Sequence, residues 1–188
     1  MKSVIRLVLI LNLAYFMVEF AMARAIGSVS LFADSIDFLE DGMVNLLILI
    51  ALDWSRPRRA GVGMALALIL LVPGLATLWT AWNQFHLHLP PRPIPLSLTG
   101  GGALLVNFSC ALMLSRYRKH AGSLTKAAFL SARNDVFANI AIIAAGIVTS
   151  IHPSIWPDMA VGLGIAVMNA DAAKEVWSAA RAERHSDS

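Results

Sequence analysis

Charge and cysteine are what this sequence has least of. Only 14% of its 188 residues are charged, whereas 57% are hydrophobic. The mean hydropathy of +0.67 is too high for an ordinary soluble domain of this length. The single cysteine, Cys110, excludes an intramolecular disulfide, and its apolar segment favours a small buried side chain over a thiolate ligand. The composition therefore predicts a membrane protein.

Other absences narrow the class of function. The sequence has no glycine-rich phosphate-binding loop, no serine-protease pattern and no HExxH motif. The pI of 9.4 does not indicate nucleic-acid binding, because the Lys and Arg residues lie in short clusters between apolar segments. Gly100 to Gly102 indicate flexibility or close packing. His86 and His88 could meet a metal ion, but two histidines at that spacing fit a solvated loop better.

Six segments are long and apolar enough to cross a bilayer, which takes about 20 helical residues. They are predicted at residues 4–23, 29–53, 60–85, 96–115, 124–149 and 156–180. The predicted fold is an all-α bundle of six transmembrane helices over residues 1–182, with a short cytoplasmic tail at 183–188. The first segment could also pass for a signal peptide, but Asn12 and Glu19 share a face, which favours a retained helix.

Basic residues orient this bundle. On one side they lie at the start of the first segment, in the second and fourth connections and at the end of the chain: Lys2, Arg6, Arg56, Arg58, Arg59, Arg116, Arg118, Lys119, Lys126, Lys174, Arg181 and Arg184. The opposite side has only Arg24, Arg92 and the uncharged stretch SIHPSIWP. The positive-inside rule then places both termini in the cytoplasm, and we expect a bacterial inner-membrane protein.

The second segment carries the clearest functional signal. At 100° per residue, four of its polar side chains fall within an arc of about 80°: Asp34, Asp37, Asp41 and Asn45. Acids within a membrane helix are costly unless they face a cavity, a partner or a cation. A hydrogen-bond network that only holds helices together is the alternative, but like charges this close would repel one another without a cation.

The fifth segment supplies a matching polar face, with Ser131, Asp135 and Asn139 at positions i, i+4 and i+8. Asp135 lies near mid-span and can complete a divalent-cation site with Asp37 and Asp41. A cation bound there would displace the protons of the acids, which predicts proton–metal exchange. Arg133 points elsewhere, and its role stays open; an acid such as Glu40 is a candidate partner.

A faint internal repeat links the two halves of the chain. Two sets of residues occur at nearly equal spacing, Asn12, Asp41 and Asn45 in the first half and Asn107, Asp135 and Asn139 in the second. The second and fifth helices would run in opposite directions, so the repeat would be an inverted one of three helices. Such repeats place a substrate site near the middle of the membrane.

The run SVSLFADSIDFLED, preceded by NLAYFMVEF, resembles the first two helices of the cation diffusion facilitators. The resemblance continues through LILLVPGLATLW, NDVFANIAIIAAG and the PD near residue 158, and covers nearly the whole chain. It implies a six-helix homodimer with cytoplasmic termini that exports divalent cations against protons. The expected cargo is zinc, cobalt, cadmium, manganese or iron, with no prosthetic group.

In that family the second helix provides an HxxxD or DxxxD pair, which Asp37 and Asp41 match. The fifth helix provides a second pair, of which Asp135 matches the later member, while Ser131 stands where histidine or aspartate is usual. Ser131 or water would then be the fourth ligand, and oxygen-only sites favour ions harder than zinc, such as manganese, cobalt or iron. A second departure is the expected absence of the cytoplasmic metal-binding domain that often follows the sixth helix.

Further polar residues are candidates for lining the ion pathway: Asp34, Asn45, Asn139 and Glu19. For Asp34 and Glu19, structural hydrogen bonding is an equal alternative. Asp158, at the outer start of the sixth helix, is interpreted as a cap of that helix and not as a ligand. Two rival functions stay open: a non-transporting membrane subunit that pairs with a full-length relative, and an intramembrane hydrolase with paired acids. The sequence offers no second catalytic constellation, so it predicts a transporter and not an enzyme.

Overall fold

The computed structural model describes residues 2–51, 75–116 and 122–169, and all regular structure in these ranges is helical. The helices are α1 (Lys2–Ile26), α2 (Val29–Ala51), α4 (Pro93–Ser115) and α5 (Gly122–Ile151), with further helical segments at 75–87 and 156–169. The predicted all-α fold with six helices is thus confirmed. The predicted helical stretches 60–74 and 170–180, the tail and the basic residues from Arg56 to Arg59 lie outside the described residues.

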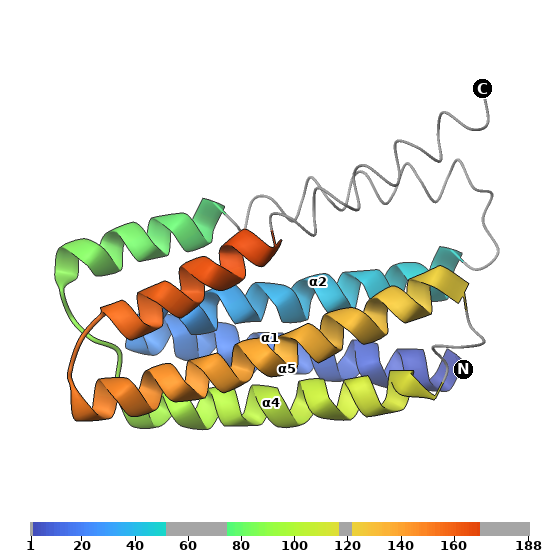
Figure 1. The fold of residues 1–188 in the computed structure, drawn as a ribbon. Helices are drawn as coiled ribbons and strands as arrows, with labels where there is room; N and C mark the ends of the chain where they lie inside the picture. The colour runs from blue at the N-terminus through green and yellow to red at the C-terminus, as the bar shows by residue number, and fades with distance from the viewer. Residues whose placement is uncertain (1, 52–74, 117–121, 170–188) are drawn as a thin grey trace.

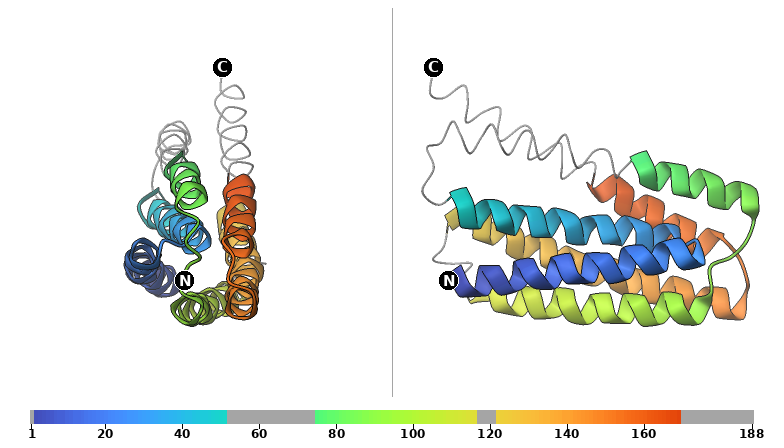
Figure 2. Two further views of the ribbon diagram at one scale, coloured as in Figure 1. Left: turned by 90° about the vertical axis from the view of Figure 1, so that its left-hand side faces the viewer. Right: turned by 180° about the vertical axis from the view of Figure 1, so that it is seen from behind.

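Two antiparallel helix pairs form the body of the bundle (Figure 1). α1 turns into α2 at Gly27, whose φ of 68° suits a residue without a side chain. α4 packs along α5, and the two pairs meet where α1 contacts α4 and α2 contacts α5. Segments 75–87 and 156–169 lie at one end of the bundle, next to the start of α2 (Figure 2).

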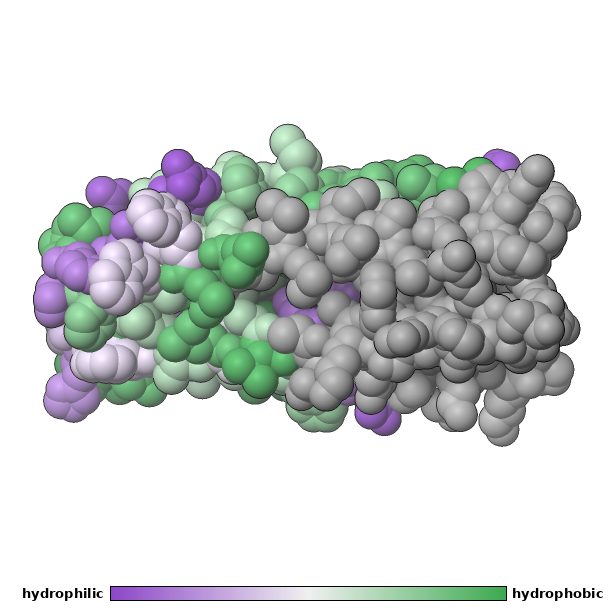
Figure 3. All heavy atoms as spheres, turned by 90° about the horizontal axis from the view of Figure 1, so that it is seen from above, coloured by the Kyte–Doolittle hydropathy of each residue, from purple (hydrophilic) through white to green (hydrophobic). Residues whose placement is uncertain are grey.

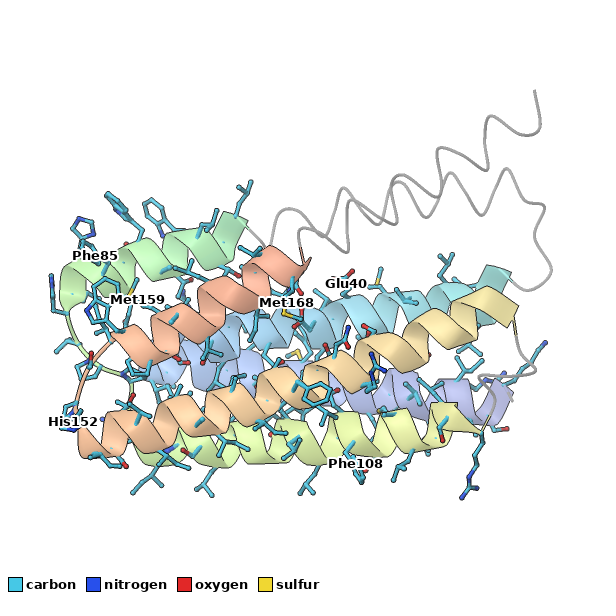
Figure 4. All side chains as sticks on the ribbon, in the orientation of Figure 1. Glu40, Phe85, Phe108, His152, Met159 and Met168 are labelled. Atoms are coloured by element: carbon cyan, nitrogen blue, oxygen red, sulfur yellow. The ribbon has the colours of Figure 1, made fainter. Side chains whose placement is uncertain are left out.

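The outer faces of the bundle are apolar and its interior holds acids, which is the pattern of a membrane protein. α1, α4 and residues Ser131–Ile151 of α5 are each long and apolar enough to cross a membrane. Phe108 projects from α4 away from the other helices (Figure 4). Seen from above, polar and apolar residues are mixed at the left-hand end of the described surface, and apolar residues lie toward the middle (Figure 3).

Two apolar clusters fill the bundle, and a polar layer separates them. One cluster joins Ile5 and Val8 of α1 to Ile48, Cys110, Leu114 and their neighbours. The other joins Ala23 to Leu31, Leu96, Ile142 and their neighbours near the opposite end. On α1 and α4 the buried polar residues lie between the contributions of the helix to these two clusters. Asp37 and Asp41 of α2 and Asn139 of α5 occupy the corresponding positions.

Glycines allow α4 to approach its neighbours closely. A Cβ atom at Gly100 would lie 2.9 Å from Ile142 of α5, and one at Gly102 would overlap the Tyr15 hydroxyl of α1. The sequence left open whether these glycines provide flexibility or close packing, and the structure shows close packing at Gly100 and Gly102. The Tyr15 hydroxyl donates a hydrogen bond to the Thr99 carbonyl at 2.7 Å, which ties α1 to α4.

Asp158 caps α2, whereas the sequence predicted that it caps its own helix, the segment 156–169. Its carboxylate accepts hydrogen bonds from the Val29 amide at 2.7 Å and from the Ser28 hydroxyl at 2.6 Å. The Ser30 amide and hydroxyl also donate to it. These donors include N–H groups that the first turn of a helix leaves free, and a carboxylate there also interacts favourably with the helix dipole. Asp158 thereby fixes segment 156–169 to the start of α2.

The packing of segment 156–169 against the start of α2 predicts that alanine substitutions at two of its glycines differ in their effect on stability. A Cβ atom at Gly162 would lie 2.7 Å from the backbone of Val29 and Ser30, whereas nothing lies within 4 Å of one at Gly164. We expect Gly162→Ala to lower the free energy of unfolding by about 1–3 kcal/mol through overpacking. Gly164→Ala is the matched control, with a gain of up to about 1 kcal/mol from helix propensity. Thermal unfolding in detergent measures both, and equal melting temperatures would contradict the close contact.

Candidate cation site

The polar layer between the two apolar clusters contains the residues singled out from the sequence. It is built by α1, α2, α4 and α5, and its members are Asn12, Glu19, Asp34, Asp37, Asp41, Asn45, Asn107, Ser131, Asp135 and Asn139. All except Ser131 and Asp135 are buried, and these two are partly buried. Four helices thus enclose an acidic layer whose side chains are mostly shielded from solvent.

Asp41 and Ser131 join α2 to α5 directly. The Ser131 hydroxyl donates a hydrogen bond of 2.8 Å to Oδ1 of Asp41. One turn further along α2, the side-chain amide of Asn45 donates to the Asp41 backbone carbonyl at 2.7 Å. The structure therefore brings together two residues that lie 90 positions apart and that the family pattern places in the same site.

Asp37 and Asp135 complete the acidic group at this junction. The charge of Asp135 interacts with that of Asp37 and with that of Asp41, so the three predicted ligands lie in one electrostatically coupled region of α2 and α5. Across the described ranges, however, no three His, Cys, Asp or Glu side chains are close enough to hold one ion directly. Binding a cation here would require the carboxylates to draw closer together.

Two of the predicted lining residues, Asp34 and Asn139, form a hydrogen-bonded chain with Asn107. The side-chain amide of Asn107 donates to Oδ1 of Asn139 at 3.0 Å, and the amide of Asn139 donates to Oδ2 of Asp34. Asp34 and Asn139 are fully buried. In this structure they connect α4, α5 and α2, which accords with the structural alternative for Asp34; their part in an ion pathway stays a prediction.

The two halves of the internal repeat differ in their hydrogen bonding. The register of the repeat equates the Asn107–Asn139 pair with Asn12 and Asn45. Asn107 and Asn139 are hydrogen-bonded, whereas Nδ2 of Asn12 and Oδ1 of Asn45 are buried without a partner among the described atoms. The two halves therefore use the same residue types, but only the second half makes the bond.

Sequence reasoning missed where Cys110 lies. The prediction of a small buried side chain is confirmed, since the free thiol is buried. Its sulfur lies 3.9 Å from Oδ1 of Asn12, and it interacts electrostatically with Asp41 and Asp135. The available signal was its position three residues after Asn107, which places both on one face of α4.

Arg133 and the two histidines lie outside the polar layer. Arg133 is exposed and donates to the side chain of Asn134 at 3.4 Å, and no ion pair joins it to Glu40. Glu40 projects from the edge of α2 that faces away from α4 (Figure 4). His86 and His88 are exposed, and their Nδ1 atoms approach the backbone carbonyls of Trp82 and His86.

An apolar helical bundle with a buried acidic layer defines an integral membrane protein whose interior suits positive charge. Residues 5–181 match the family model of the cation efflux transmembrane domain, and the chain belongs to this family. The chain is therefore a membrane-embedded cation efflux transporter. No curated protein matches the chain.

Proposed function

We propose that this protein exports a divalent transition-metal cation in exchange for protons. Asp37, Asp41 and Asp135 bind the ion, and the Ser131 hydroxyl or a water molecule is the fourth ligand. The observation that carries the proposal is the junction of α2 and α5, where the Ser131–Asp41 hydrogen bond and the charge of Asp135 meet in a buried layer.

Exchange follows from the electrostatics of this junction. Three carboxylates in a buried layer repel one another, so the ion-free state requires protons on some of them. A divalent cation supplies the compensating charge and displaces those protons. Transport then alternates between a proton-loaded and a cation-loaded bundle, with the three acids as the shared binding groups.

The ligand set also favours some ions over others. A site of three carboxylates and a hydroxyl contains only oxygen, and harder divalent ions suit it better than soft ones. We therefore propose manganese, cobalt or iron ahead of zinc and cadmium. The start of α1, the end of α2 and the start of α5 share one end of the bundle (Figure 1), which is the end that the basic connections assign to the cytoplasm of a bacterial cell.

Proton flux in proteoliposomes tests this function. Purified protein is inserted into vesicles that contain a pH-sensitive dye, and zinc, cobalt, cadmium, manganese and ferrous iron are added one at a time. We expect proton movement with one or two of these ions and none in protein-free vesicles. Absence of flux with every ion, from folded and inserted protein, would overturn the autonomous transporter and favour a subunit that requires a full-length relative.

A further inference from the structure

A second pair of acids lies in the polar layer, apart from the proposed metal ligands. Glu19 of α1 and Asp34 of α2 are both fully buried. Their carboxyl groups interact electrostatically, so they lie close to each other between α1 and α2. Among the described contacts, no hydrogen bond joins either of them to Asp37, Asp41 or Asp135.

Most oxygens of this pair lack a donor. Both carboxyl oxygens of Glu19 and Oδ1 of Asp34 are buried with no hydrogen-bond partner among the described atoms. Two ionised carboxylates have only acceptors, so neither can satisfy the other. A proton on one of them supplies the donor that is missing and removes one of two adjacent buried charges.

The groups that face the pair cannot supply positive charge. The titratable neighbours that act on it are Tyr15 of α1, Asp37 and Asp41 of α2, and Asp135 of α5. The side chain that α5 presents directly is the neutral Asn139. No Lys, Arg or His is among the described groups that act on the pair, so these groups leave its negative charge to be balanced by a bound ion.

The amide chain indicates which ion this is. Asn107 donates to the oxygen of Asn139, which directs the N–H group of Asn139 toward Asp34. A metal ion at Asp34 would favour the carbonyl oxygen of Asn139 as a ligand, not its N–H group. Asp34 is thus arranged as an acceptor, and the proton of the pair belongs on Glu19, from which it can be donated to Oδ1 of Asp34.

We propose that Glu19 and Asp34 form a dedicated proton-binding site, which holds one shared proton in the metal-free protein at neutral pH. The site is separate from the metal ligands. If the proposed function holds, a divalent cation among Asp37, Asp41 and Asp135 brings two positive charges close to the pair and favours release of that proton. Cation binding would then release a proton from a group that does not touch the cation.

Infrared spectroscopy of the metal-free protein tests the site without transport. The C=O stretch of a protonated carboxyl group is separate from the carboxylate bands, and it shifts in heavy water. We expect Glu19→Gln to lose the equivalent of one protonated carboxyl from the wild-type spectrum at neutral pH. Gln has nearly the same size, and its amide can still donate to Asp34, so the fold should be retained.

Two further variants make the result decisive. Asp34→Asn should lose the same band, because its amide can donate to an ionised Glu19. Glu40→Gln is the matched control: the same substitution, in an acid of α2 outside the pair, should leave this band unchanged. A full wild-type band in folded Glu19→Gln and Asp34→Asn proteins would overturn the proposal.

Coupling to the cation is measured separately. On saturation with the ion that binds most tightly, Glu19→Gln should release about one proton fewer than the wild type, as recorded with a pH dye in weak buffer. Equal release by both proteins would overturn the coupling. Failure of every ion to bind would instead overturn the proposed function, while the infrared difference between the variants would remain.

Discussion

Asp41→Asn is expected to reduce cation transport and binding by more than about 100-fold, since even partners that only orient metal ligands contribute about 10–100-fold to affinity. Asp41 is the predicted ligand that lies at the junction of α2 and α5, where it accepts the Ser131 hydroxyl. Asparagine keeps the size of the side chain and an acceptor for that hydroxyl but removes the negative charge. We therefore expect transport and binding to fall because the charge is removed, while the fold is retained.

Ion uptake into proteoliposomes and calorimetric titration in detergent measure this loss. Glu40→Gln is the control on the neighbouring residue, because it also removes one acid from α2 but leaves the predicted ligands intact. We expect this variant to retain transport within a few-fold of the wild type. Wild-type uptake by Asp41→Asn would show that the cation binds elsewhere, and an equal loss in both variants would show that total charge alone matters.

Ser131→His is expected to change which ion the site prefers. Histidine would add an imidazole nitrogen at the position where the family usually carries histidine or aspartate. Nitrogen ligands suit zinc, whereas oxygen-only sites suit manganese better. We expect the ratio of zinc to manganese affinity to rise by about tenfold or more, an effect of at least about 1.4 kcal/mol.

Two controls separate the ligand from the hydrogen bond. Ser131→Ala removes the bond to Asp41 without adding a ligand, so it should weaken binding of all ions with little change in their ratio. Ser109→His places the same residue on the exposed face of α4, where the native hydroxyl only bonds to Leu105 of its own helix. An unchanged zinc-to-manganese ratio in Ser131→His would contradict a ligand role for position 131.

Much of the fold could be predicted because it depends on local patterns. The predicted helix at 29–53 begins at the same residue as the observed α2, which is described from Val29 to Ala51. The predicted segment 124–149 lies within α5, Gly122–Ile151. Apolar runs of membrane length and the turn at Gly27 are signals within single segments, and such signals need no knowledge of the partner helix.

The site was predictable only in part. Asp34, Asp37 and Asp41 share a face whatever α2 packs against, because 100° per residue is a property of the helix itself. The spacing of Ser131 and Asp135 on the fifth segment already predicted them as partners, and the structure brings Ser131 to Asp41. The partner of Arg133, in contrast, depends on the direction of its side chain, which helical periodicity does not give. Arg133 contacts Asn134 and not the candidate partner Glu40.

The sequence by itself determined the all-helical membrane fold, the acidic face of α2 and the polar face of α5, since these follow from hydropathy and helical periodicity. Only the tertiary structure decided that Glu19 faces Asp34, that Asp158 caps α2 and that Cys110 lies beside the acidic layer. These contacts depend on the rotation and depth at which two helices pack. Residues far apart in the chain meet only where that packing brings their faces together, and no local pattern records it.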